Sequence, residues 1–275
     1  MKQAVKVLLA IVLSSLFTNV RSQEKHEYKE AIEDNSFLIE EAYNQEERVV
    51  QHIFNGLFQV SPSNNIFLSF TQEWPLLKYK HQVSYTIPYT FQASPSSNGI
   101  GDILLNYRYQ LFYENDWACV SPRFSLILPT GDAQKGFGNG EVGFQLSIPA
   151  SKRISDYWVI HLNAGSTILP CVSKSDTMNI KHRKTLASFN LGASTVWLLA
   201  KNFNLFLEVL ENFNNEFNES GNTVYNNQTI LNPGFRFAIN LNKLQIVPGL
   251  SVPITISGNK PVYSAFLYLS FEHPY

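Results

Sequence analysis

The chain has 275 residues, of which 44% are hydrophobic, 13% aromatic and only 16% charged, and its formal net charge is −1. Few charges and many aromatic residues favour a transmembrane barrel, although a secreted β-sandwich or propeller shares this composition. The lack of a basic excess gives no electrostatic case for nucleic acid as a partner. Two cysteines are too few for a disulfide scaffold.

The first 22 residues have the pattern of a signal peptide. Lys2 and Lys6 form a basic region before an apolar stretch at 7–17, and residues 20–22 have the form of a cleavage site. The apolar stretch is well short of the roughly 20 residues that a spanning helix needs. We therefore expect residues 1–22 to be removed on export.

Residues 23–48 are rich in glutamate and differ in composition from the rest of the chain. Residues 31–47 have some helical character, so we expect a periplasmic N-terminal segment that is partly helical. A disordered leader is the alternative interpretation. If this segment or residues 170–183 blocked the lumen of a barrel, passage would need a gated mechanism.

From Val49 onward, apolar and polar residues alternate with period two. In residues 103–113 every odd position is apolar or aromatic, and stretches 81–92 and 229–240 behave in the same way. Side chains of a strand point alternately to its two faces. In a membrane barrel one face meets lipid and the other meets water, but a soluble sandwich also alternates.

Strand length and the rhythm of the connections favour the membrane. Several alternating stretches reach about 10 residues, which suits a tilted spanning strand. We predict an all-β, antiparallel up-and-down transmembrane β-barrel of about 12 strands over residues 49–275. Its connections would alternate between short ones, at 114–116, 151–155, 201–202 and 241–243, and long external ones, at 130–139, 170–183 and 214–227.

The C-terminus has the pattern of a last barrel strand. Residues 263–271 alternate, and the chain ends on Tyr275. A terminal aromatic residue after an alternating strand resembles the signal that the outer-membrane assembly machinery recognises. Either Phe271 or Tyr275 could be the recognised residue.

Polar residues on the inward positions define the expected lumen. Arginines and carboxylates together would create a transverse field that orients polar solutes. The alternative is that these side chains pair with one another and brace the wall of a narrow barrel. The candidate pore-lining residues are Asp102, Asn106, Arg108, Gln110, Arg123, Glu141, Gln145, His161, Asn190, Glu208, Asn232, Arg236 and Asn240.

Catalytic chemistry has little support in the sequence. His161 with Ser166 or Ser188 is the one pair that a lipid hydrolase could use, but a lone strand histidine is more often structural or pore-lining. His81 and His182 have no metal-ligand spacing near them. We expect no enzyme activity, no catalytic residue, no metal and no cofactor.

Four motifs resemble one known family. They are Gly99-Ile100-Gly101-Asp102, residues 124–132 (Phe-Ser-Leu-Ile-Leu-Pro-Thr-Gly-Asp), residues 37–46 and residues 231–237. Together they resemble the meta-pathway phenol-degradation family of outer-membrane transporter-like β-barrel proteins. The resemblance implies a membrane barrel in the outer membrane of a Gram-negative bacterium and a role in solute passage. It supplies no substrate.

The sequence therefore predicts a channel in the outer membrane for passive uptake or efflux of small solutes, which could be hydrophobic or aromatic. Membrane lipid and a small-molecule solute are its expected partners. A non-conducting structural or binding barrel is the second hypothesis. A membrane-embedded lipid hydrolase is the third.

Overall fold

The computed structural model describes residues 36–60, 64–113, 116–175, 181–217, 222–258 and 260–275. Strands make up most of these residues, and the helices among them are the 3₁₀ turns η1 (Lys78–Lys80) and η2 (Ala133–Lys135). Within the same ranges, no helix has the length and apolar character to cross a membrane. The expected signal peptide, residues 1–22, lies outside the described residues.

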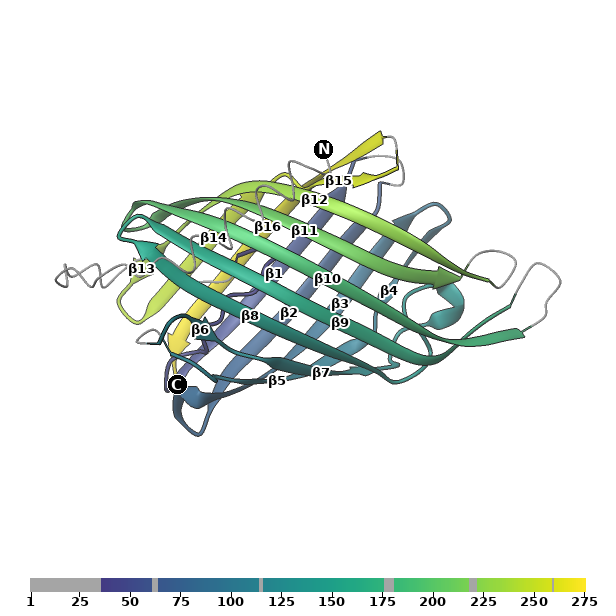
Figure 1. Cartoon of the computed structure of the whole chain (residues 1–275), viewed down its shortest axis with the longest axis horizontal. Helices are drawn as coiled ribbons and strands as arrows, with labels where there is room; N and C mark the ends of the chain where they lie inside the picture. Colours follow the sequence, from purple (N-terminus) through teal and green to yellow (C-terminus); the bar gives the residue numbers. More distant parts are fainter. Residues whose placement is uncertain (1–35, 61–63, 114–115, 176–180, 218–221, 259) are drawn as a thin grey trace.

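The strand segments follow one another along a single antiparallel sheet (Figure 1). They are β1 (Val49–Gln59), β2 (Ile66–Leu76), β3 (His81–Ala93), β4 (Ser96–Ile100), β5 (Ile103–Tyr109), β6 (Cys119–Val120), β7 (Arg123–Leu128), β8 (Gly143–Ser155), β9 (Trp158–Ser175), β10 (Lys181–Ala200), β11 (Phe203–Phe217), β12 (Thr223–Phe237), β13 (Ile239–Leu241), β14 (Leu244–Ser251), β15 (Ile254–Ser257) and β16 (Lys260–Pro274).

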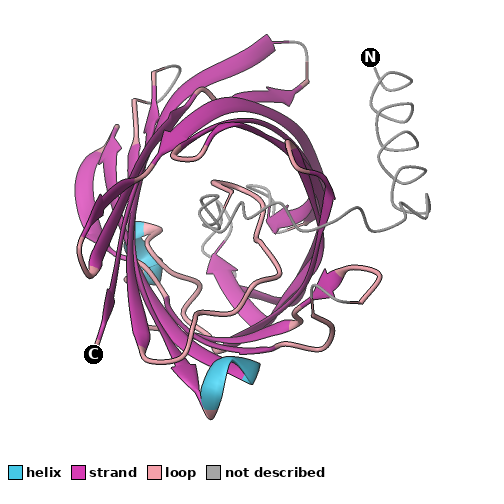
Figure 2. Ribbon diagram, turned by 90° about the vertical axis from the view of Figure 1, so that its left-hand side faces the viewer, coloured by secondary structure: helices cyan, strands magenta, loops and turns pink. Residues whose placement is uncertain are grey.

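The sheet closes on itself into a barrel, because β1 pairs with β16 from Val49↔Pro274 to Gln59↔Ser264 (Figure 2). Four pairs of consecutive segments are each one interrupted strand, because both members of a pair hydrogen-bond to the same neighbouring strand. These pairs are β4 with β5, β6 with β7, β12 with β13, and β14 with β15. In the described part of the chain the barrel therefore has 12 strands. The predicted fold class and strand number are confirmed.

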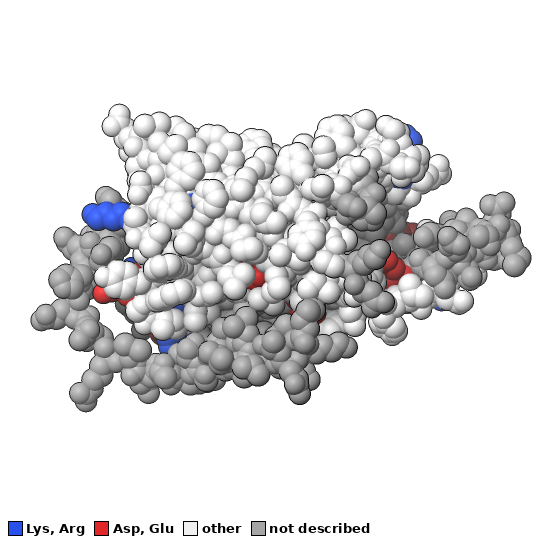
Figure 3. All heavy atoms as spheres, turned by 90° about the horizontal axis from the view of Figure 1, so that it is seen from above, with Lys and Arg blue, Asp and Glu red and all other residues white. Residues whose placement is uncertain are grey.

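Alternation along the strands assigns the two faces of the wall. On β5, Asn106 and Arg108 are buried, whereas Leu105 and Tyr107 are 46% and 41% exposed. An apolar exterior and a polar interior are the reverse of a soluble protein and typical of a membrane barrel. Figure 3 shows that one outer side of the molecule bears few charged side chains among the described residues.

Most of the expected long connections are strand instead. Residues 170–183 belong largely to β9 and β10, which pair up to Lys181↔Ser175. Residues 214–227 belong largely to β11 and β12, which pair up to Phe217↔Thr223. The short connection expected at 151–155 is the end of β8. Polar composition suggested loops here, but antiparallel pairing satisfies the backbone whatever the polarity of the side chains.

Candidate functional site: the barrel interior and its inner segment

Residues 36–47 pass through the interior of the barrel and contact strands around its circumference (Figure 2). We call them the inner segment. We expected residues 23–48 to form a partly helical periplasmic segment. For residues 36–47 this expectation is wrong, because they contain no helix and are enclosed by the barrel. Residues 23–35 lie outside the described residues.

Side chains of the wall satisfy the backbone N–H groups at the start of the inner segment. The Glu208 carboxylate accepts from the N–H of Leu38 at 3.1 and 3.2 Å and from that of Ile39 at 3.0 Å. The Asn163 side chain accepts from the N–H of Glu40 at 2.6 Å and donates to its carbonyl at 3.0 Å. Buried backbone groups require partners, so these contacts hold the segment extended.

The same arrangement continues along the segment. The N–H of Ala42 donates to Ser151 Oγ at 2.8 Å, and the Gln110 side chain donates to the Ala42 carbonyl at 2.8 Å. Gln110 Oε1 also accepts from the N–H of Asn44 at 3.0 Å. Polar groups on the wall thus replace the hydrogen bonds that a helix would have made, which explains why the glutamate-rich segment is not helical.

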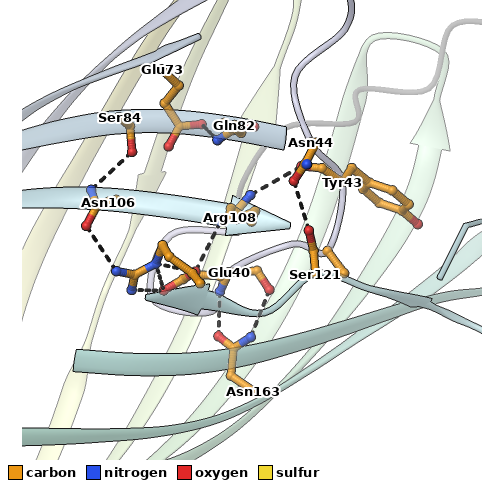
Figure 4. A network of polar contacts seen from close by, with 12 residues as sticks. Glu40, Tyr43, Asn44, Glu73, Gln82, Ser84, Asn106, Arg108, Ser121 and Asn163 are labelled. Carbon is orange, nitrogen blue, oxygen red and sulfur yellow. Dashed lines mark hydrogen bonds and ion pairs between the residues drawn. The ribbon is translucent and has the colours of Figure 1, made fainter. Parts of the chain in front are cut away.

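Glu40 forms an ion-paired cluster with two arginines of the wall (Figure 4). Arg123 Nε lies 3.0 and 3.2 Å from the two carboxylate oxygens, Arg123 Nη2 contacts Oε1, and Arg108 Nη2 lies 3.1 Å from Oε2. Glu40 is not on a strand. Burial by itself raises the pKa of Glu40, but the charges and hydrogen bonds of Arg123 and then Arg108 outweigh it and lower the pKa to about 2.

Glu41 pairs with the opposite part of the wall. Its Oε1 lies 3.1 Å from Arg236 Nη2 on β12 and 3.6 Å from His161 Nε2 on β9. The side chains of all three residues are at most 4% exposed. Adjacent glutamates therefore reach in different directions, which fixes the orientation of the inner segment about its own axis.

An apolar pocket of the wall holds the ring of Phe37. The ring stacks against Tyr268 at a centroid distance of 4.9 Å and against Phe266 at 5.4 Å, and meets Phe206 edge-on at 4.5 Å. A Cβ atom on Gly249 would come within 2.2 Å of this ring. The interior is thus aromatic near Phe37 and charged near Glu40.

Most of the predicted pore-lining residues meet at the inner segment. Six contact it directly: Arg108, Gln110, Arg123, His161, Glu208 and Arg236. Three others contact those six: Asn106 and Gln145 accept hydrogen bonds from Arg123, and Asn232 donates to Glu208 at 2.6 Å.

The remaining four lie elsewhere. Asp102 binds the 129–142 loop, and Glu141 in that loop pairs with Arg183 at 3.2 Å. Asn190 is half-buried beside Gly165, and Asn240 is exposed and accepts from Gln245.

Sequence reasoning missed the residues of the inner segment itself. Phe37, Glu40 and Glu41 were assigned to a segment outside the barrel, and the local pattern holds no signal of their partners. Asn163 and Gln82, which bind the backbone of the segment, were omitted although both lie on the polar positions of alternating strands. The period-two pattern could have found those two.

Two of the family-like motifs meet in the structure. The Asp102 carboxylate accepts from the N–H of Gly131 at 3.0 Å, from the N–H of Asn139 at 2.7 Å and from its side chain at 3.0 Å. A Cβ on Gly131 would lie 2.4 Å from the Phe137 carbonyl oxygen. The glycine lets the loop approach its own backbone closely, and Asp102 ties the loop to the wall.

The catalytic pair considered from the sequence is not formed. His161 Nδ1 lies 2.8 Å from the hydroxyl of Ser151, rather than that of Ser166 or Ser188. Both His161 and Ser151 are 1% exposed, and Ser151 Oγ also accepts from the Ala42 N–H. The arrangement positions the inner segment against the wall.

These features define the class of fold: a closed 12-stranded β-barrel of the kind found in outer-membrane channels. The chain is similar to the COG4313 outer membrane channel from Pseudomonas putida F1, with a TM-score of 0.65, 11% identity, and coverage of 92% of this chain and 100% of that one. It is also similar to the NanC porin, with a TM-score of 0.52, 7% identity, and coverage of 82% and 100%.

At these identities the likeness shows the fold alone. A scan against models of protein families matched none of them. A search of curated proteins found no match either. The resemblance to the meta-pathway phenol-degradation family therefore stays a prediction.

Proposed function

We propose that the protein is an outer-membrane channel for passive passage of small solutes, located in the envelope of a Gram-negative bacterium. The observation that carries the proposal is a closed barrel whose polar interior binds a separate piece of chain. In this proposal the piece, which lies across the interior, moves to admit the solute, and the inner segment acts as a gate. The fold shared with outer-membrane channels supports the proposal.

The pocket around Phe37 favours a hydrophobic or aromatic solute. Phe206, Phe266 and Tyr268 offer stacked and edge-on contacts to one planar ring. Such contacts contribute about 0.5–1.5 kcal/mol per aromatic pair beyond burial. A solute ring that displaced Phe37 would recover these contacts.

The other parts of the proposal rest on the sequence patterns at the two ends of the chain and on the barrel between them. Residues 1–22 would direct export, residues 49–275 would form the barrel with lipid around it, and the assembly machinery would recognise the end of β16. The charged residues around Glu40 line the path of the solute. The protein would act without enzymatic chemistry or a cofactor.

Single-channel conductance in planar bilayers tests the proposal. We expect rare, small openings for the wild-type protein and frequent ones for the Glu40→Ala/Glu41→Ala variant, in which the inner segment loses its ion pairs. Swelling of liposomes in an isotonic solution of a small sugar, which crosses a lipid bilayer only slowly without a channel, provides the flux measurement. If neither protein conducts or swells liposomes, the channel is refuted in favour of a non-conducting binding barrel.

The lipid hydrolase alternative is tested separately with phospholipid vesicles. Release of fatty acid by the wild-type protein, lost in the His161→Ala variant, would establish it. No release by either protein, or equal release by both, would remove the only candidate residue for catalysis.

A further inference from the structure

Two histidines face each other across the seam where the barrel closes. His52 lies on β1 and His273 on β16, and their Nε2 atoms are 3.2 Å apart. The ring centroids are 5.3 Å apart with an interplanar angle of 22°. Both side chains are half-buried. The first and last strands of the barrel therefore each contribute one imidazole to the same point.

The tautomer of His273 follows from its second contact. Its Nδ1 lies 3.1 Å from the carbonyl oxygen of Pro274. A carbonyl oxygen only accepts, so Nδ1 carries the proton and Nε2 presents a lone pair toward His52. Metal-binding histidines are commonly oriented in this way, with the remote N–H donated to a backbone carbonyl.

The separation of the two nitrogens suits one shared cation. Zinc binds imidazole nitrogen at about 2.0–2.1 Å in tetrahedral geometry, which places two such nitrogens about 3.4 Å apart. Imidazole favours zinc, copper and nickel over calcium or magnesium. In the described residues no group of three or more potential ligands gathers, so water would complete the coordination.

We propose that His52 and His273 form a zinc-class metal site that ties the first strand of the barrel to the last. Sequence reasoning predicted no metal, because these histidines are 221 residues apart and spacing patterns detect only local ligands. The site is independent of solute passage. It would stabilise the closed seam near the C-terminus, where the N–H of Tyr275 also donates to the Arg48 carbonyl at 3.0 Å.

Calorimetric titration of Zn²⁺ into the folded, tag-free barrel in detergent tests the site. We expect one Zn²⁺ per barrel and a thermal unfolding midpoint that rises with zinc but not with Mg²⁺. His52→Gln and His273→Gln should each abolish both effects. His81→Gln is the matched control, because His81 is also paired with a ring partner, Tyr107, at 2.7 Å and should leave zinc binding unchanged.

A second measurement needs no variant. Carbethoxylation of histidines, read by mass spectrometry, should be suppressed by Zn²⁺ at His52 and His273 but not at His81. Equal modification with and without zinc, or wild-type zinc binding that persists in the His52→Gln/His273→Gln protein, would show that the contact is a simple hydrogen bond between two neutral rings and would overturn the proposal.

Discussion

Arg123 on the barrel wall and Glu40 on the inner segment, 83 positions apart in the sequence, form a two-pronged ion pair in which Arg123 Nε lies 3.0 and 3.2 Å from the carboxylate oxygens. The side chains are 15% and 26% exposed. Arg108 reaches the same carboxylate from the neighbouring strand. The inner segment is thus anchored by one carboxylate, that of Glu40, which lies between two guanidinium groups.

We expect Glu40→Gln to loosen the inner segment. Removing one partner of a buried ion pair costs about 3–5 kcal/mol, and the partial exposure of Glu40 places the effect near the lower figure. Amides 38–45 should then exchange with solvent about a hundredfold faster, as read by hydrogen–deuterium exchange. Glu47→Gln, at an exposed position of the same segment, is the control. Unchanged exchange in Glu40→Gln would mean that the ion pair does not hold the segment.

The anchoring by Glu40 should also depend on pH in a defined way. Its pKa is lowered from 4.5 to about 2 by the arginines, so its contribution to stability is fully present above pH 4.5 and is lost as the pH falls toward 2. The difference in amide exchange between the wild type and Glu40→Gln should stay constant from pH 8 to pH 5 and shrink below. A difference that vanishes near pH 6 would contradict the lowered pKa.

Gly192 on β10 should be intolerant of a side chain. A Cβ there would lie 2.2 Å from Cδ1 of Ile39, which is 1% exposed, so this buried side chain must shift. Overpacking of this kind costs about 1–3 kcal/mol. We expect Gly192→Ala to increase channel openings in planar bilayers and Gly192→Ala/Ile39→Ala to reverse the increase. Failure of the second change to compensate would show that Ile39 is not the group displaced.

Asp102 should hold the 129–142 loop against the wall. Loss of its three accepted hydrogen bonds in Asp102→Ala leaves partly buried donors without the carboxylate, at about 1–3 kcal/mol for each. Trypsin should then cleave after Lys135 faster than in the wild type. Asp132→Ala, which removes the exposed cap of η2 and the ion pair with Lys135 but leaves the contacts of Asp102, is the comparison. Equal rates of cleavage in Asp102→Ala and the wild type would show that Asp102 does not hold the loop against the wall.

The alternation of apolar and polar residues is enough to predict the wall of the barrel. Period-two alternation places Asn106 and Arg108 on one face and Leu105 and Tyr107 on the other, because successive side chains of a strand point to opposite faces of the sheet. The strand number followed from the spacing of these stretches. Composition suggested connections at 151–155, 170–183 and 214–227, where the residues are largely in strands.

The contents of the barrel interior cannot be predicted in the same way, because they depend on contacts between distant parts of the chain. Which acid meets Arg123, and which ring meets Tyr268, depends on closing the sheet and threading residues 36–47 through it, and no local period encodes such contacts. The helical tendency of the inner segment gave way because Glu208, Asn163 and neighbouring wall groups supply its backbone with partners. The pairing of His52 with His273 likewise exists only after β1 and β16 have joined.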